Sequence, residues 1–525
     1  MAITNFLYEI LKISLVALTT YIVYYYYKYF TRENPLPGPF PLPFIGNTHQ
    51  IFKNFAFNTG VLQSKYGDLC EYYMGSERFI LLSNYDLIQK IMKPIVNGPF
   101  HNRVKDDNEG LKEIGVMNIG TVFNNDYNDW QYYRKFFTKV LMSPSFVKHS
   151  VTAINNSFSE IEQYWDKLGE DTVFEFNRWM NLYFFDIIFI TTTSDPAYAL
   201  LNYYNQITPN EKSPVPKGIL TESDLFIKSV DAYGNSLVYF FQIPRIFRNF
   251  PGINRFTQHL KDRLNWLRIT VDNIIKSKRE EISKTPIDQK LKSDMLTMLL
   301  TVNTERDITE RIADDLHDKP MSDKDVEANF VEAMAGGVET SSHSICFLVN
   351  YLENNPRVKK KMIEEIEHVL GKDLNSPFKL EDLTKLVYVD AVIKEVSRIH
   401  PIVTQSYKIN SVPEVIGGYK WSKDTNFVLN YEVIQRSTSY WKDPETFNPD
   451  RFIDNPESKS KVFMFGGGMR MCPGRHLGMM GLKATLAMLY RKYDIELLGP
   501  CKEHLMQIRS CDELKVKLRK RKSLK

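Results

Sequence analysis

Cysteine is scarce in this chain, with five among 525 residues. They are Cys70, Cys346, Cys472, Cys501 and Cys511. The number is odd, the spacings are wide and no C-x-x-C pair occurs, so neither a disulfide framework nor a zinc ribbon is indicated. The cysteine usage is typical of a protein in a reducing compartment.

An excess of one charge is also missing, because 67 basic residues face 63 acidic ones and the net charge is +4. A balance this close excludes a nucleic-acid partner bound through overall charge. The sequence contains no internal repeat and no low-complexity tract. Its hydrophobic fraction of 43% is that of a globular protein long enough to bury a large cofactor.

Only one long apolar run occurs, from Phe6 to Tyr27, and at about 1.5 Å per residue it would reach roughly 33 Å as a helix. Glu9 and Lys12 interrupt it near its outer end, where they can pair or snorkel. The uncharged part, 13–27, would not span a bilayer alone. A cleaved signal peptide and a buried helix are the alternatives, but no basic segment precedes the run and no small-residue cleavage site follows it.

We therefore predict a single-pass transmembrane anchor at residues 1–28, followed by a proline-rich hinge at 29–46 and a catalytic domain at 47–525. Lys28 and Arg32 follow the apolar run, so the positive-inside rule places the body on the cytosolic side, and we expect the endoplasmic reticulum membrane. Prolines between 35 and 43 prevent a helix and favour a stiff extended spacer. A ligand for a proline-reading domain is the alternative.

The remaining pattern predicts a mainly α fold with a small β portion. The ranges 75–83 and 418–429 are rich in aromatic and β-branched residues between turn signals, which predicts strand pairs. Helices are expected to dominate from about Ser145. The polar stretch 301–325 predicts a surface connection into a long helix over 323–352.

Cys472 stands in the segment FGGGMRMCPG, residues 465–474. Glycines let backbone N–H groups approach the sulfur, and Arg470 lies two residues before it, which favours an anionic metal ligand. A thiolate pushes electron density onto haem iron and favours O–O cleavage, whereas histidine suits oxygen carriage or peroxidase chemistry. An inert buried thiol is the usual state of a lone cysteine.

The segment has F-x-x-G-x-R-x-C-x-G at every fixed position, through Phe465, Gly468, Arg470, Cys472 and Gly474. Here the chain resembles the cytochrome P450 family. The resemblance covers about residues 35–515 and implies the family's single-domain fold and a thiolate-ligated haem. It implies that Arg470 neutralises a haem propionate and that Gly474 opens the helix after the ligand. Gly478 departs from the family, which usually has alanine there.

Glu395 and Arg398 are three residues apart on one helical face, and Arg451 follows in the segment FNPDRF. Surface Glu/Arg pairs are common and contribute little. The resemblance implies instead a buried structural triad of Glu395, Arg398 and Arg451. Asp450 stands where the family more often has glutamate.

Ala335–Ser341 reads AGGVETS within the predicted long helix. Two glycines in a helix each cost about 1 kcal/mol and need a reason, and close packing against another helix is the simplest. The resemblance implies that they permit a distortion beside the haem, that Thr340 bonds dioxygen or a water, and that Glu339 relays protons in place of the usual aspartate.

Trp130 and Arg134 are four apart on one predicted helical face. By themselves they indicate a cation–π or surface pair. The family's W-x-x-x-R motif implies that both donate hydrogen bonds to haem propionates. The five motifs occur in the family's order.

The sequence thus predicts a haem-thiolate monooxygenase that uses dioxygen and electrons from an NADPH-dependent flavoprotein reductase to oxidise a lipophilic small molecule reached from the membrane. Lys459, Lys461 and Arg475 are basic residues on the cysteine side that an acidic partner would fit. For each of them alone, a solvated charged face is an equal alternative. Two alternatives stay open. One keeps the fold but rearranges lipid hydroperoxides without a reductase; the other is a haem sensor without turnover.

Overall fold

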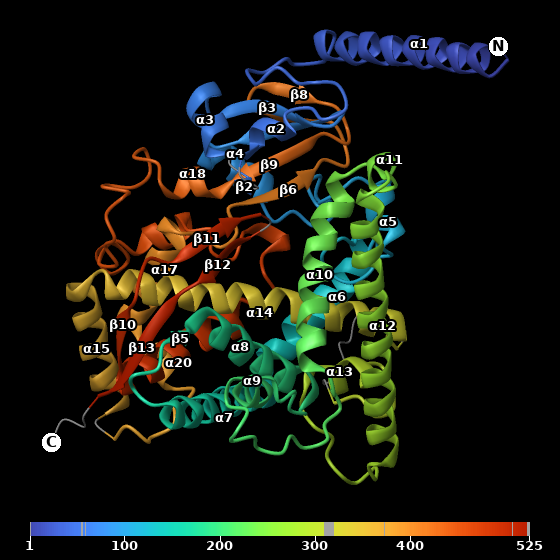
Figure 1. The fold of residues 1–525 in the computed structure, drawn as a ribbon. Coiled ribbons are helices and arrows are strands. Elements are labelled where there is room, and N and C mark those ends of the chain that lie inside the picture. The colour runs from blue at the N-terminus through green and yellow to red at the C-terminus, as the bar shows by residue number, and fades with distance from the viewer. Residues whose placement is uncertain are drawn as a thin grey trace. The chain divides into compact units, whose positions relative to one another are not determined.

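The computed structural model describes residues 2–53, 56–57, 59–308, 320–371, 373–506 and 508–521. These residues are mainly helical with short strands (Figure 1), as the sequence predicts. The chain forms two compact units. The first comprises Met1–Lys105 and Gln405–Ile434, and the second Asp106–Thr404 and Gln435–Lys525.

The first unit holds the apolar helix and most of the described strands. Its elements are α1 (Ala2–Phe30), α2 (Thr48–Ile51), β1 (Phe52–Lys53), β2 (Ala56–Phe57), α3 (Gly60–Tyr66), β3 (Leu69–Met74), β4 (Glu77–Leu82), α4 (Tyr85–Met92), β6 (Gln405–Ile409), β7 (Glu414–Ile416), β8 (Tyr419–Trp421) and β9 (Asn426–Asn430), with α18 (Tyr431–Gln435) at the boundary between the units. A four-stranded sheet has the order β3-β4-β9-β6, in which only β4 and β9 run parallel.

The two predicted strand pairs are only partly right. Residues 75–83 contain one strand, β4, because its hairpin partner β3 lies before the turn at Gly75. Residues 418–429 contain two strands in different sheets: β8 pairs with β7, while β9 pairs with β4 and β6. Aromatic and β-branched residues mark each strand, but the choice of partner depends on residues far away in the sequence.

Helix α1 is long and apolar enough to cross a membrane. Its side chains from Thr4 to Thr20 are all exposed, and exposure of an apolar helix on every side suits lipid rather than water. Glu9 and Lys12, the two charges that interrupt it, form an ion pair at 3.0 Å.

The proline-rich segment is docked on the first unit's sheet rather than standing free. The buried carboxylate of Glu71 in β3 accepts hydrogen bonds from Arg32 at 2.6 Å and from the Leu36 amide at 3.3 Å. The Glu71 amide donates to Pro37 O at 2.9 Å. A Cβ at Gly38 would lie 2.1 Å from Glu71 O, so only glycine permits this approach.

The second unit is largely helical. Its elements are α5 (Glu109–Glu113), α6 (Tyr127–Met142), α7 (Pro144–Leu168), β5 (Phe174–Glu175), α8 (Phe176–Thr193), α9 (Ala199–Ile207), α10 (Ser223–Gln242), α11 (Arg245–Arg248), α12 (Ile253–Lys284), α13 (Met295–Thr301), α14 (Asp323–Glu353), α15 (Pro356–Leu370), α16 (Asp382–Lys385), α17 (Val387–Ile399), α19 (Arg451–Asp454), η1 (Pro456–Lys461), η2 (Gly468–Arg470), α20 (Arg475–Lys492), β10 (Tyr493–Leu497), β11 (Lys502–Leu505), β12 (Arg509–Glu513) and β13 (Lys515–Lys520). Strands β10, β13 and β5 form one antiparallel sheet, and β11 and β12 form a hairpin.

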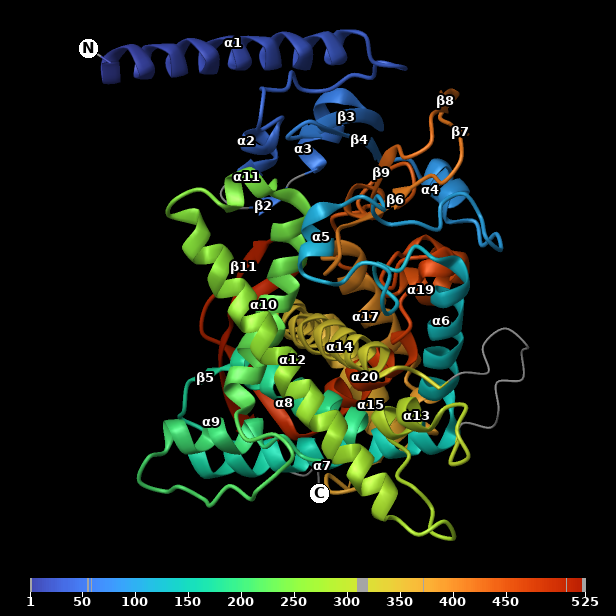
Figure 2. The ribbon, with the colours of Figure 1, turned by 90° about the vertical axis from the view of Figure 1, so that its right-hand side faces the viewer.

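Helix α14 runs through the middle of the second unit. Figure 2 looks nearly along it and shows α8, α12, α17 and α20 around it. Ser322 and Asp325 form a capping box at its start, which satisfies backbone donors that the helix leaves open. Its bounds confirm the predicted long helix. The part of the predicted connection at 309–319 lies outside the described residues.

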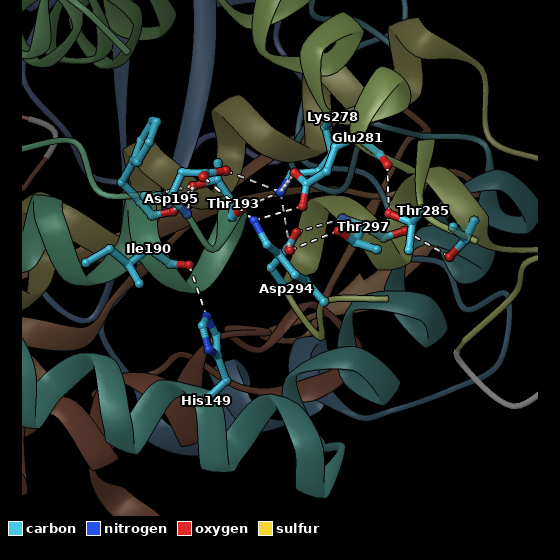
Figure 3. Close-up of polar contacts among 12 residues, drawn as sticks. His149, Ile190, Thr193, Asp195, Lys278, Glu281, Thr285, Asp294 and Thr297 are labelled. Carbon is cyan, nitrogen blue, oxygen red and sulfur yellow. Dashed lines mark hydrogen bonds and ion pairs between the residues drawn. The ribbon is translucent and has the colours of Figure 1, made fainter. Parts of the chain in front are cut away.

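A buried lysine joins three elements at one end of the second unit (Figure 3). The Lys278 amine of α12 donates to Thr193 O at 2.6 Å and Glu281 at 2.9 Å, and lies 3.6 Å from Asp294, which caps α13. Burial alone would lower the pKa of Lys278, but Asp294, Glu281 and Asp195 outweigh it and raise that pKa. The ammonium group therefore stays charged and ties α12 to the end of α8 and the start of α13.

Candidate haem-thiolate site

Cys472 lies in the turn between η2 and α20. Its amide donates to Phe465 O at 2.9 Å and closes the loop. Gly466 and Gly468 have φ values of 70° and 64°, a region that side chains with a Cβ rarely adopt. The glycines are thus required by the path of the loop. Gly474 caps α20, so Cys472 precedes a helix N-terminus, whose dipole favours a thiolate.

Arg470 and Trp130, 340 positions apart in the chain, meet at this loop. The guanidinium carbon of Arg470 lies 4.5 Å from the centre of the Trp130 ring. Arg470 also donates to Thr121 O at 2.8 Å and to Asn124 O. Arg134 lies one turn beyond Trp130 on α6 and is partly exposed. The structure therefore brings the W-x-x-x-R motif to the cysteine loop.

Glu332 of α14 is a residue that the motifs did not indicate. Its carboxylate accepts from the Thr121 amide at 2.7 Å, the Thr121 hydroxyl at 2.7 Å and the Val122 amide at 3.0 Å. The 121–124 segment is thus held by Arg470 from the cysteine loop and by Glu332 from α14. A single glutamate in a helix carries no sequence signal for this contact.

The two glycines of α14 have different surroundings. A Cβ at Gly337 would lie 3.0 Å from Cδ1 of Ile188 in α8, whereas one at Gly336 would meet nothing within 4 Å. Gly337 thus serves the close packing of α14 on α8. Gly336 is exposed and Thr340 partly exposed, although the helix crosses the core. One face of α14 therefore borders accessible space.

The structure gives helix α14 as one unbroken α-helix from Asp323 to Glu353. The Thr340 hydroxyl donates to Gly336 O at 2.7 Å, a bond to the carbonyl four residues earlier that often bends a helix. The distortion expected at these glycines stays a prediction.

Glu339 forms a hydrogen-bonded carboxyl pair with Asp231 of α10. Burial, followed by the charge of Asp231, raises the pKa of Glu339 to about 8. Burial also raises the pKa of Asp231, but the hydrogen bond from Glu339 and, less strongly, the positive Arg178 oppose that shift. Two adjacent carboxyl groups do not both ionise easily. Near neutral pH Glu339 is therefore protonated, and its O–H donates a hydrogen bond to the Asp231 carboxylate.

Asp231 is a second residue that the sequence motifs missed, because one aspartate in an amphipathic helix resembles any solvated residue. Arg178 of α8 is held close by an ion pair with Asp224 at 2.7 Å. Lys228 also pairs with Asp224, at 2.6 Å. The Glu339–Asp231 pair therefore lies near charged side chains of α8 and α10 that are held by their own ion pairs.

Glu395, Arg398 and Arg451 meet in the interior. Arg398 makes two bonds to the Glu395 carboxylate, at 2.8 and 2.9 Å, and both side chains are fully buried. Arg451 donates to the same carboxylate at 3.0 Å. Arg398 further donates to Gln435 O and Pro444 O, each at 2.8 Å. The network fixes α17 to the segment that leads toward the cysteine loop.

The described residues fit a haem. Cys472 offers a soft sulfur donor before a helix N-terminus, and Arg470 offers a cation beside it. The loop residues 471–475 are all partly exposed, and Gly336 leaves room for a flat group beside α14. Among the described residues no cluster of three or more His, Cys, Asp or Glu side chains is arranged to hold a bare metal ion. A single thiolate with donors for acidic groups suits a prosthetic group that brings its own iron ligands.

Comparison with known proteins settles the family. A sequence model of cytochrome P450 matches residues 36–517. The chain belongs to the cytochrome P450 family. It is therefore a P450 monooxygenase, an oxidoreductase of a family whose members carry a thiolate-ligated haem.

Curated P450 relatives match over nearly their whole length but at low identity. Cytochrome P450 3A14 of Cavia porcellus is 24% identical, over 94% of this chain and 92% of its own. Tabersonine 3-oxygenase of Catharanthus roseus is 25% identical, over 88% and 86%. Salviol synthase of Salvia pomifera is 25% identical, over 90% and 87%. Relatives that differ this much in name do not indicate which substrate this P450 oxidises.

Proposed function

We propose that this P450 inserts one atom of dioxygen into a lipophilic small molecule, using electrons from an NADPH-dependent flavoprotein reductase. The observation that carries the proposal is the convergence of Cys472, Arg470 and Trp130 at one loop. They come from two separate motifs, and Thr340, from a third, lies in the same compact unit.

Cys472 is the axial ligand in this proposal. Phe465, Gly468 and Gly474 shape its loop, the first through its carbonyl bond to the Cys472 amide. Arg470, Trp130 and Arg134 provide donors for the propionates. When bound, the thiolate-ligated haem supplies dioxygen activation. Arg470 keeps its carbonyl partners in the 121–124 segment, so its guanidinium is already oriented before it meets an acid group.

Thr340 and Glu339 handle protons in this proposal. Glu339 holds a proton at pH 7, because burial keeps its pKa near 8, and Asp231 accepts the hydrogen bond. The Thr340 hydroxyl at rest donates to Gly336 O. Rotation about its χ1 breaks that bond and turns the hydroxyl toward the accessible face of α14, where it gives up its proton. Glu339, the preceding residue, then returns a proton to the Thr340 oxygen and is left as a carboxylate.

Helix α1 anchors the protein in the endoplasmic reticulum membrane with the catalytic body in the cytosol. The exposed apolar surface of α1 supports the anchor, and Lys28 and Arg32 support the orientation. Lys461 and Arg475 are partly exposed on the segments that flank the cysteine loop, and they suit an acidic reductase surface. The side chain of Lys459 lies outside the described residues.

The test measures NADPH consumption, product and peroxide with reductase present. Thr340→Ala should keep NADPH consumption but divert electrons to peroxide. Thr138→Ala is the matched control, since Thr138 makes the same bond, to Arg134 O at 2.9 Å, at an exposed position of α6. Full coupling in Thr340→Ala would refute the proton role.

The same assay separates the two other functions. Turnover of a lipid hydroperoxide with no substrate-dependent NADPH consumption would assign the chain to the reductase-independent isomerases. A haem protein that neither turns over a hydroperoxide nor consumes NADPH with substrate would be a sensor. Substrates are best sought by a screen that follows the haem absorbance on binding.

A further inference from the structure

Three of the five cysteines gather around the C-terminal hairpin, although Cys346 lies far from the other two in the sequence. Cys501 immediately precedes β11, Cys511 lies in β12 and Cys346 lies on α14. The sulfurs of Cys501 and Cys511 are 3.1 Å apart, and none of the three is in a disulfide in this structure. Cys511 also shares a thiol hydrogen bond with Cys346.

The backbone around these thiols is well fixed. Strands β11 and β12 pair with an irregularity between Lys502 and Glu503, and Cys511 stands opposite Glu503. The Cys511 amide donates to Nδ1 of His343 on α14 at 3.2 Å. The hairpin is therefore attached to α14 one turn beyond Glu339.

The three thiols differ in access. Cys346 is completely buried and Cys511 is 2% exposed, whereas Cys501 is partly exposed. An oxidant in solution therefore reaches Cys501 first. Cys511 then lies within contact distance of the modified sulfur, and a reaction between groups held this way has a high effective concentration.

The charged surroundings slow the first step without preventing it. Hydrogen bonding to Cys511, then burial, raises the pKa of Cys501, and hydrogen bonding to Cys346 raises that of Cys511. The nearby Glu503 and Asp512 act in the same direction. These acids face His400, Arg509 and His504, while buried His343 is neutral with a pKa near 4. No thiolate is favoured at neutral pH, so the pair rests reduced.

We propose that Cys501 and Cys511 are a modification site for peroxides and form a reversible disulfide across the hairpin. The Cys501 thiolate attacks hydrogen peroxide, the O–O bond breaks, and a sulfenic acid and one water form after proton uptake. The Cys511 sulfur attacks the sulfenic sulfur, the S–O bond breaks and the second water leaves. Two thiols and one hydrogen peroxide thus give one disulfide and two waters.

Formation of the Cys501–Cys511 disulfide depends on neither the P450 substrate nor electron transfer. It needs only the folded hairpin, which is attached to α14 through His343. A disulfide closes the loop 501–511 and restricts the strand that contacts α14 next to the proposed proton pair. The thiol pair would thus be oxidised when peroxide reaches the second unit, which also contains the Cys472 loop.

The experiment treats the full-length, haem-loaded protein with hydrogen peroxide, blocks free thiols and maps tryptic peptides by mass spectrometry. Cleavage after Lys492, Lys502, Arg509 and Lys515 places the cysteines in the peptides 493–502 and 510–515. The expected product is these two peptides joined, two hydrogens lighter than their sum, and separated again by dithiothreitol. Formation should speed up about tenfold from pH 7 to pH 8, because thiolate increases tenfold per pH unit below the pKa.

Two variants and one condition make the result decisive. Cys501→Ser should leave Cys511 reduced, whereas Cys70→Ser should leave the link unchanged. Urea-unfolded protein should convert a smaller share of its oxidised Cys501 to the Cys501–Cys511 link, because only the folded hairpin holds the two sulfurs together. Further oxidation of Cys501 to its sulfinic acid without a link, a Cys346–Cys511 link in its place, or an equal linked share in folded and unfolded protein would overturn the proposal.

Discussion

Glu339→Gln isolates the proton that the folded protein holds between two carboxyl groups. The pKa of Glu339 rises from an ordinary 4.5 to about 8 on folding, mainly through burial. Below pH 4.5 both the folded and the unfolded chain are protonated there. As pH rises from 4.5 toward 8, the unfolded chain releases this proton and the folded chain keeps it, so stability falls by about 1.4 kcal/mol per pH unit.

Between pH 5 and pH 7 this loss amounts to roughly 3 kcal/mol. A glutamine does not titrate and its amide still donates to Asp231, so the variant should lack this part of the decline. The assay is the free energy of urea unfolding of the full chain in detergent, measured at both pH values. Glu364→Gln is the control, because Glu364 is 62% exposed on α15.

A second readout observes the proton directly. At pH 7 the infrared difference spectrum between folded wild type and Glu339→Gln should contain the C=O stretch of one protonated carboxyl group, while the band of other buried carboxyl groups, such as Asp186, cancels. An identical pH dependence of stability in wild type and Glu339→Gln, together with an unchanged carboxyl band, would refute the reasoning.

Three further perturbations have expected outcomes. Glu395→Gln leaves two arginines without their shared carboxylate and should lower the unfolding free energy by about 3–5 kcal/mol; a loss below about 1 kcal/mol in urea titration would contradict a buried triad. Lys278→Met strands Asp294 and its neighbouring acids and should cost a similar amount, with destabilisation shrinking at low pH as the acids protonate; a pH-independent effect would argue against charge as the cause. Deletion of residues 2–30 should move the protein from the membrane to the soluble fraction on ultracentrifugation, and unchanged sedimentation would mean that another surface binds the membrane.

The sequence predicted the parts of the site that lie in local motifs. The F-x-x-G-x-R-x-C-x-G segment and the long helix at Asp323 each depend on residues within a few turns, so spacing and capping signals identify them. The family follows from the same motifs.

What the sequence could not predict depends on contacts across long separations. Asp231 faces Glu339 from another helix, and Glu332 holds the 121–124 segment, yet neither acid stands in a pattern that differs from a solvated surface. The gathering of Cys346 with Cys501 and Cys511 was likewise hidden, because wide spacing in the chain says nothing about separation in space.

The axial thiolate is the central claim, and the carbon-monoxide difference spectrum of the reduced protein tests it most directly. Wild type and the control Cys70→Ser, at a buried position in β3, should both show the thiolate-type band. Cys472→Ser should lose that band even where haem remains bound. A Cys472→Ser protein with an unchanged thiolate-type spectrum would contradict the assignment of Cys472 as the haem ligand.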